Sequence, residues 1–414
     1  MSASKTPQTA LAADPNFPPA RGRLAEYLDE SQPEVQHLLK HGWCVVRVLS
    51  EEEAAKYLKW VWADLAAMGT GIKMKDASTL TKGSYPGAPR GLMQAGGAGL
   101  CPSHCAAANA AEREMQRLFG AKGVQALLRA WDALGFMDPD KVKNYAKRCR
   151  DAHVKALSAW LHTDDAPPKY KGTDLLHWVQ MIIALEPVEH GDIGTQVVGA
   201  PDNMNMQAFV DWFGEERPDQ APSEKKLKSA HQWQKVGWCD HDTGDKEWLA
   251  KHGVPAKPHL RPGEALMWTS RTPHANIAED AGDKPRNWRT SVLTNYIPRA
   301  VAYDKEIAKR QEMGEKGRTS GHQVVARGAA FDKNGSLCEQ LFGKAPNTYG
   351  PPHPGMWDHN KTPLPVMNGF ARYKRPRSEW SDAERYPDPE RHPKIYKIHA
   401  DTARLCFGYD TAEA

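Results

Sequence analysis

His162 and Asp164, in the segment WLHTDDAPP, stand two positions apart and can bind a metal together. On a β-strand, residues i and i+2 point to the same face, so this imidazole and this carboxylate can bind the same metal ion. A second histidine would complete a set that leaves three coordination positions open, and iron(II) suits such a mixture of nitrogen and oxygen donors. The open positions can take a bidentate 2-oxoacid and O2.

The spacing alone is not specific, because 17 histidines give about one His-x-Asp pair by chance and the chain holds three. His190 and Asp192 lie among glycines directly after a predicted strand, which is typical of a turn that holds side chains loosely. His399 and Asp401 have no histidine after them, so a set in that chain order would lack its third ligand. The first pair is followed by several predicted strands that can return a histidine to it, and it is favoured.

His274, in the segment LRPGEALMWTSRTPHAN, is the candidate second histidine. Arg271, three residues earlier, can pair with a substrate carboxylate or orient the loop. A 2-oxoacid with a distal carboxylate also needs a cationic anchor, and arginine binds carboxylates through two hydrogen bonds and stays charged when buried. Arg289 is the favoured anchor, because it opens a predicted strand that we expect to lie beside the His274 strand in a hairpin. Arg286 is the alternative.

The elements that must position these residues are short strands in the middle of the chain and helices before them. Strands are predicted at His41–Leu49, Leu175–Val188, Gly194–Asp202, Ala265–Thr269 and Arg289–Pro298. Helices are predicted after the capping box Ser50–Glu53 and at Ala106–Phe119, Val124–Leu134, Pro139–Trp160, Met206–Gly214 and Tyr303–Met313. The pattern favours an all-β core with flanking helices (α+β), a double-stranded β-helix or cupin-like jelly roll. Trp160 and Gln180 would flank the metal strands as pocket residues.

The length of 414 residues fits one large domain with additions. We expect a disordered leader at 1–30, a jelly-roll domain at 31–330 with a helical flank, and a Pro-rich basic C-terminal extension at 331–414. Within the domain, we expect an insertion at 215–258, whose charged residues 215–235 are predicted to lie on the surface.

Composition limits the partners and the compartment. The net charge of +4 suits an anionic small substrate and is too weak to indicate nucleic acid. No apolar run approaches the ~18 residues of a membrane span, and the N-terminus lacks the apolar stretch of a secretory signal. Seven scattered cysteines do not suggest a disulfide framework, so we expect a cytoplasmic protein. The segment CPSHC at 101–105 lacks an evident fourth zinc ligand, and a Gly/Cys-rich loop is favoured there.

Five motifs in order resemble the phytanoyl-CoA dioxygenase superfamily of Fe(II)/2-oxoglutarate oxygenases. They are HGWCVVRVLSEEEAAKYL, WLHTDDAPP, LLHWVQMIIAL with HGDIGTQVVGAPDN, LRPGEALMWTSRTPHAN and RTSVLTNYIPR, which together cover about residues 40–300. The resemblance implies that His162, Asp164 and His274 are metal ligands and that Arg289 binds 2-oxoglutarate. One departure is visible, because Gly199-Ala200-Pro201-Asp202 stands where the family has a Pro-Gly-Ser-His turn.

The resemblance implies an Fe(II)- and 2-oxoglutarate-dependent dioxygenase that uses O2, with ascorbate as activator. It would hydroxylate, desaturate or cyclise a small, anionic metabolite such as an amino acid derivative or an acyl compound. Two alternatives stay open. The basic stretch Arg372–Arg377 (RYKRPR) and the long loops suit a nucleobase-modifying oxygenase that acts on nucleic acid, and the fold alone suits a non-catalytic jelly-roll binding protein. The substrate and the oligomeric state do not follow from the sequence.

Overall fold

A computed structural model describes a large part of the chain. The described residues are 24–67, 73–79, 92–93, 99, 102–120, 126–130, 133–139, 147–164, 178–217, 239–278, 287–302, 307–308, 310, 401–402 and 404–406. Within them, the strands form two antiparallel sheets, one of seven strands and one of five.

The larger sheet runs in the order β1-β10-β6-β12-β4-β2, and β3 also pairs with β12. Its strands are β1 (Trp43–Arg47), β2 (Leu92–Met93), β3 (Leu127–Arg129), β4 (Ala133–Met137), β6 (Val179–Ala184), β10 (Glu264–Thr269) and β12 (Arg289–Pro298). The smaller sheet runs in the order β8-β5-β11-β7-β9. Its strands are β5 (His162–Thr163), β7 (Gly194–Gly199), β8 (Cys239–Asp240), β9 (Val254–Ala256) and β11 (His274–Ile277). From β4 to β7, and again from β9 to β12, consecutive strands alternate between the two sheets.

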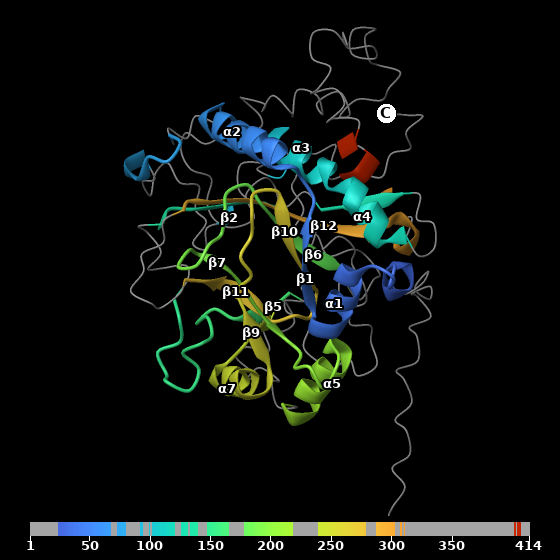
Figure 1. Cartoon of the computed structure of the whole chain (residues 1–414), viewed down its shortest axis with the longest axis vertical. Coiled ribbons are helices and arrows are strands. Elements are labelled where there is room, and N and C mark those ends of the chain that lie inside the picture. Colours follow the sequence, from blue (N-terminus) through green and yellow to red (C-terminus); the bar gives the residue numbers. More distant parts are fainter. Residues whose placement is uncertain are drawn as a thin grey trace, which may run out of the picture.

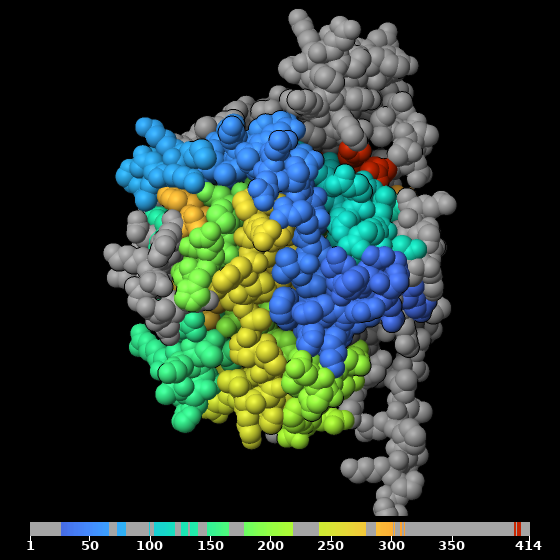
Figure 2. All heavy atoms as spheres, viewed as in Figure 1, coloured from blue at the N-terminus to red at the C-terminus, as the bar shows by residue number. Residues whose placement is uncertain are grey.

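Helices lie around the sheets (Figure 1). They are α1 (Pro33–His41), α2 (Glu51–Ala67), α3 (Pro102–Ala110), α4 (Glu112–Leu118), α5 (Met206–Glu216) and α7 (Thr243–His252), with 3-10 turns η1 (Leu24–Tyr27), η2 (Ala77–Thr79) and η6 (Arg299–Val301). The predicted capping box is confirmed, because the Ser50 hydroxyl accepts from the Glu53 backbone N–H at 3.1 Å and the Glu53 carboxylate accepts from the Ser50 backbone N–H at 2.8 Å. In the space-filling view, the N-terminal segment (blue) abuts the segment that carries β10 and β11 (yellow; Figure 2).

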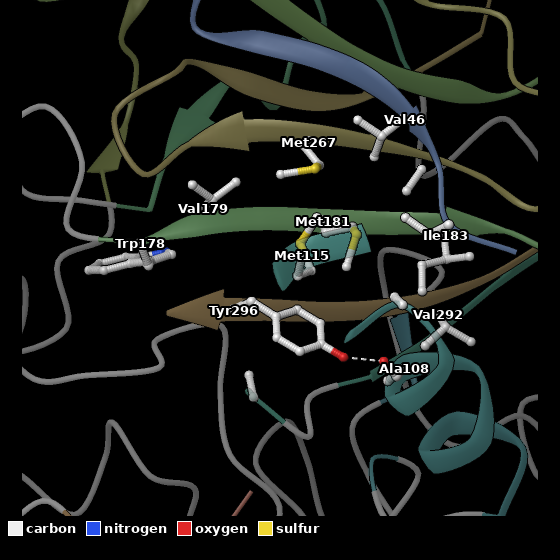
Figure 3. Packing of buried hydrophobic residues seen from close by; sticks show 14 of the residues in the cluster. Val46, Ala108, Met115, Trp178, Val179, Met181, Ile183, Met267, Val292 and Tyr296 are labelled. Carbon is white, nitrogen blue, oxygen red and sulfur yellow. Dashed lines mark hydrogen bonds between the residues drawn. The ribbon is translucent and has the colours of Figure 1, made fainter. Parts of the chain in front are cut away.

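The larger sheet is buried on both faces, and alternate residues of each strand serve different cores. Val179, Met181 and Ile183 of β6 pack toward the helices, with Tyr296 of β12 donating its hydroxyl to the Ala108 carbonyl of α3 (Figure 3). The residues between them face the smaller sheet. This inner core joins Ala133, Ile182, Ala184, Leu266, Trp268 and Leu293 of the larger sheet to Val197 and Ala256 of the smaller one. The sheets therefore pack face to face, and the space between them can hold a site.

The predicted helix at Val124–Leu134 is wrong. Its described residues lie mainly in β3 and β4, which pair with successive stretches of β12. Leucine and alanine favour helices in isolation, but both strands are buried along their whole length, and pairing with β12 overrides the local preference.

The predicted helix at Pro139–Trp160 is also wrong over the part that the structure describes. Residues 147–160 form turns closed by an antiparallel bridge between Arg148 and Ser158. The Ala159 backbone N–H donates to the Lys147 carbonyl at 2.8 Å, so the segment folds back on itself and delivers the chain to β5.

The surface insertion predicted at 215–235 lies almost entirely outside the described residues. Residues 239–258 belong to the fold itself, because they supply β8 beside β5, β9 beside β7, and α7, whose Leu249 is buried. Helix α7 begins at an Asp242/Asp245 capping box. The domain boundaries remain predictions, although residues 404–406 return to the core, where Leu405 and Cys406 are buried. No helix within the described residues is long and apolar enough to cross a membrane.

Candidate metal centre

Three donor side chains meet on the inner face of the smaller sheet. His162 of β5 and His274 of β11 are paired in register across two antiparallel strands, and Asp164 follows β5 directly. The Asp164 carboxylate places Oδ1 3.7 Å from His162 Nε2 and Oδ2 3.4 Å from His274 Nε2. One donor atom of each residue lies within 4.8 Å of the other two, and all three residues are buried. No other group of three such ligands occurs in the described part of the chain.

Both imidazoles are oriented by backbone carbonyls. His162 Nδ1 lies 3.0 Å from the Trp160 carbonyl, and His274 Nδ1 lies 2.9 Å from the Thr272 carbonyl. A carbonyl can only accept, so each Nδ1 carries the proton and each Nε2 keeps its lone pair for a metal. Hydrogen bonds of this kind fix the tautomer and the ring orientation in metal-binding histidines. The donor set and its tautomers therefore fit a divalent transition metal such as iron(II).

Aromatic rings support the two histidines. Trp160 stacks on His162 with ring centroids 4.3 Å apart and an interplanar angle of 23°. Trp268 of β10 packs against His274 at 4.8 Å and 47°. The two imidazoles lie 4.4 Å apart. The ligands thus have little freedom to leave their positions, since each ring is packed from at least two sides.

Gln180 holds the aspartate from the opposite sheet. Its side chain Nε2, projecting from β6, donates to Asp164 Oδ2, and only 2% of Gln180 is exposed. A carboxylate oxygen accepts and does not donate, so the amide nitrogen of Gln180 must face it and the amide oxygen must point elsewhere. The segment of His162 and Asp164 therefore contacts the larger sheet through Gln180 and the smaller sheet through β11.

The Arg289 side chain crosses from the larger sheet to the smaller one and reaches Asn276, two residues after His274 on β11. Arg289 begins β12, yet its guanidinium donates to Asn276 Oδ1 of β11 and, at 2.6 Å, to Thr195 Oγ1 of β7. Burial lowers the pKa of Arg289 to about 10, and no acidic partner for it is found among the described residues. A buried charge without a counter-ion is costly, which indicates that an anion belongs beside it.

The predicted hairpin between the Arg289 and His274 strands is wrong. Strand β12 pairs with β6, β4 and β3 in the larger sheet, whereas β11 belongs to the smaller one. Arginine still reaches β11 because its side chain is long enough to bridge two packed sheets. Arg271 is buried in the turn between β10 and β11. Arg286 lies outside the described residues.

The competing His-x-Asp pair occupies a turn, as predicted. Asp192 accepts hydrogen bonds from the backbone of Glu189 and from the backbone and side chain of Asn287, which uses both of its carboxylate oxygens. His399 and Cys101 lie outside the described residues. His104 of the CPSHC segment is buried and donates Nε2–H to the Leu293 carbonyl at 2.8 Å.

Several polar residues of the site were not predicted. Thr195 and Asn276 are register partners on β7 and β11, and they contact Arg289. Ser291 follows Arg289 at i+2 on β12, so it shares the inner face, and its buried hydroxyl has no hydrogen-bond partner among the described residues. The alternation of side chains along a strand could have indicated these residues, because a polar residue two positions from a candidate ligand or anchor points to the same face.

Comparisons with known proteins give distant structural similarities. No protein-family model matches the chain, and no curated protein matches it. Among solved structures, the non-heme alpha-ketoglutarate-dependent carbocyclase SnoK from nogalamycin biosynthesis aligns at 14% identity and a TM-score of 0.34, over 66% of this chain and 85% of that one. EctD from S. alaskensis with bound Fe aligns at 14% and 0.35, over 75% and 92%. The epimerase SnoN in complex with Fe3+, alpha-ketoglutarate and nogalamycin RO aligns at 15% and 0.28, over 62% and 78%.

Proposed function

We propose that this protein is an Fe(II)- and 2-oxoglutarate-dependent oxygenase that acts on a small molecule, built on a jelly roll of the phytanoyl-CoA dioxygenase type. The observation that carries the proposal is Arg289, a buried guanidinium without an acid partner among the described residues, placed beside the His162/Asp164/His274 cluster. A metal site alone would fit many functions. The added anion anchor selects a ligand that chelates the metal at one end and carries a carboxylate at the other.

The separation between anchor and metal site supports this ligand. Asn276, which accepts from Arg289, lies two residues after His274 on β11. Two residues on a strand span about 6.8 Å, and their side chains point to the same face. A five-carbon 2-oxoacid with carboxylates at both ends suits that span. Thr195 adds a hydroxyl in contact with the same guanidinium, and Ser291 adds a buried hydroxyl two residues after Arg289 on the same face of β12.

The residues of the chain perform three tasks in this proposal. The carbonyls of Trp160 and Thr272 hold the imidazoles with Nε2 free, and Gln180 fixes the Asp164 carboxylate. Arg289 binds the cosubstrate, and the surrounding core excludes water. When bound, iron(II) and 2-oxoglutarate supply the oxidation of an unactivated C–H bond by O2, with release of succinate and CO2.

The substrate side of the site includes Gln180 and Trp160, both of which lie against metal ligands. Arg271, buried in the turn before His274, is the candidate contact for an anionic substrate group. Hydroxylation, desaturation and ring closure are all compatible with these residues. Ascorbate would serve as the reductant that rescues iron oxidised in uncoupled turnover.

The test is succinate release from 2-oxoglutarate with Fe(II), ascorbate and O2, screened across amino acids, acyl compounds and nucleosides. The expected result is metal-dependent succinate release that at least one substrate class stimulates and that His162→Ala abolishes. His190→Ala, in the turn pair, is the matched control and should keep wild-type turnover. Equal succinate release in His162→Ala and the wild type would refute the proposal, and so would an absence of both iron and 2-oxoglutarate binding, which a non-catalytic binding protein predicts.

A further inference from the structure

A row of three buried polar side chains crosses the larger sheet beside the metal centre. Trp268 of β10 is the register partner of Gln180 of β6, and Gln180 is the register partner of Asn295 of β12. The exposed fractions are 3%, 2% and 3% respectively. Register partners on adjacent strands have neighbouring side chains on the same face, so the three form one continuous row.

The row faces the space between the sheets. Trp268 belongs to the inner core and touches His274, and Gln180 donates to Asp164. Asn295 follows the inner-core residue Leu293 at i+2, so it points the same way. Arg289 lies six residues before Asn295 on β12, about 20 Å of strand, so the row lies at the opposite end of this face from the cosubstrate anchor.

Each member of the row has a buried polar atom without a hydrogen-bond partner among the described residues. These atoms are Trp268 Nε1, Gln180 Oε1 and Asn295 Nδ2. Gln180 cannot be turned to relieve this, because only its amide nitrogen can donate to the Asp164 carboxylate. Buried polar groups are nearly always paired in folded proteins, and three adjacent exceptions next to a metal centre indicate a ligand.

The order of the three atoms defines the ligand's chemistry. The indole N–H donates, the Gln180 oxygen accepts and the Asn295 amide donates, so the complementary group presents acceptor, donor and acceptor in one line. The row carries no charge and spans two strand spacings, about 9.6 Å, which exceeds what one hydroxyl can bridge. A planar N–H between two carbonyls fits both the order and the span.

We propose that Trp268, Gln180 and Asn295 form a substrate subsite for a neutral cyclic imide or ureide group of a free small molecule, held beside the metal. This deepens the proposed function and rests on it for the role of the subsite in substrate binding. The anionic part of such a substrate, where there is one, would face Arg271 and leave the row to the neutral part. Mild net charge, +4 over 414 residues, favours a free molecule over a strand of nucleic acid.

The probes are 1-methyluracil and 3-methyluracil, isomers of the same size: the first keeps the N3–H between its two carbonyls, whereas the second has a methyl group at N3 and a free N1–H outside the imide. Their dissociation constants are measured by ligand-observed NMR on anaerobic protein loaded with Fe(II) and 2-oxoglutarate. We expect 1-methyluracil to bind at least about tenfold more tightly, since one buried hydrogen bond is worth about a factor of ten. Equal binding of the two isomers, or no binding of either, would overturn the subsite.

Variants place the binding on the row. Asn295→Leu and Trp268→Phe each remove one donor to a carbonyl oxygen and keep most of the packing, and each should weaken 1-methyluracil about tenfold, with 3-methyluracil titrated alongside as the reference ligand. Met181→Leu, next to Gln180 on β6 but facing the helices, is the matched control and should change neither. An equal loss in Met181→Leu would show a general packing effect and overturn the assignment.

Two further readouts separate the possible failures. Visible absorption of the Fe(II)–2-oxoglutarate chelate should persist in Asn295→Leu, which shows that this variant is folded. If the wild type lacks that absorption but still prefers 1-methyluracil, the proposed function fails and the subsite stands. A short oligothymidylate is the last arm, and tighter, salt-dependent binding of it would refute the commitment to a free small molecule.

Discussion

Replacing Arg289 by methionine should change the free energy of unfolding only slightly and weaken the binding of 2-oxoglutarate strongly. The guanidinium is buried, and desolvation lowers its pKa from an ordinary value of 12.5 to about 10. At about 1.36 kcal/mol per pH unit, this opposes folding by on the order of 3 kcal/mol. Because the folded pKa lies below the unfolded one, the penalty is fully present below about pH 10 and is relieved only as pH rises toward 12.5.

Methionine fills a similar space without charge, but it leaves Asn276 Oδ1 and Thr195 Oγ1 without their donor. Each loss costs about 1–3 kcal/mol, which roughly offsets the relief of desolvation. We therefore expect the free energy of unfolding of the metal-free, cosubstrate-free Arg289→Met protein to lie within about 2 kcal/mol of the wild type. Urea unfolding at neutral pH measures it.

Binding of 2-oxoglutarate should respond quite differently. The variant loses charge-assisted hydrogen bonds worth about 3 kcal/mol or more, roughly a hundredfold in the dissociation constant, while its affinity for Fe(II) stays unchanged. Anaerobic calorimetry on the Fe(II)-loaded protein measures this. A variant that keeps 2-oxoglutarate affinity within about fivefold of the wild type would refute the role of Arg289 as anchor.

The matched control is Arg129→Met, which removes another fully buried guanidinium. Arg129 donates to Asn109 Oδ1 at 2.8 Å and to the Ala130 carbonyl at 2.9 Å, away from the metal cluster. Its loss should cost about 3 kcal/mol of stability and leave 2-oxoglutarate affinity unchanged. If both arginine variants lost stability alike, Arg289 would be a structural residue like Arg129.

Three further predictions test the site and its support. His162→Ala should lose Fe(II) binding by calorimetry while His190→Ala keeps it, and equal affinities would contradict the ligand assignment. Burial raises the pKa of Asp64 to about 6 from 3.8, so its unfavourable charge develops as pH rises through that window. Asp64→Asn should therefore raise the free energy of unfolding by about 1–3 kcal/mol above about pH 7 and leave it unchanged near pH 4. A gain that is the same at both pH values would contradict this. Gly42 has φ +84°, and a Cβ there would lie 2.7 Å from both Met206 Sδ and Thr272 Oγ1. Gly42→Ala should therefore lower the free energy of unfolding by about 2–4 kcal/mol and weaken Fe(II) binding. Gly120→Ala, where a Cβ meets no atom within 4 Å, should do neither in the same urea-unfolding and calorimetric assays.

The strands with strong local patterns were predictable from the sequence. β1, β6, β7 and β12 all lie within predicted strands, because β-branched and apolar residues run between turn residues there. His162, Asp164 and His274 were predicted by the same reasoning, since a His-x-Asp pair needs a later strand to bring a second histidine close to it. Their convergence within 4.8 Å agrees with that prediction, and their role as ligands remains to be tested.

What the sequence did not reveal depends on contacts between distant segments. β3 and β4 look helical in isolation, and only β12 makes them strands. Pairing of β12 with β6 rather than β11 is equally non-local, so the route by which Arg289 reaches β11 was not predictable. Trp268 and Asn295 are ordinary strand residues in the sequence, and they become notable only because the register aligns them with Gln180.

The most direct test of the central claim is an anaerobic titration of 2-oxoglutarate into the Fe(II)-loaded protein, followed by visible absorption. We expect a charge-transfer band that saturates at one 2-oxoglutarate per chain, disappears in Asp164→Ala, and requires far more 2-oxoglutarate in Arg289→Met. A wild-type protein that binds Fe(II) but develops no such band, or an equal band in Asp164→Ala, would contradict the claim.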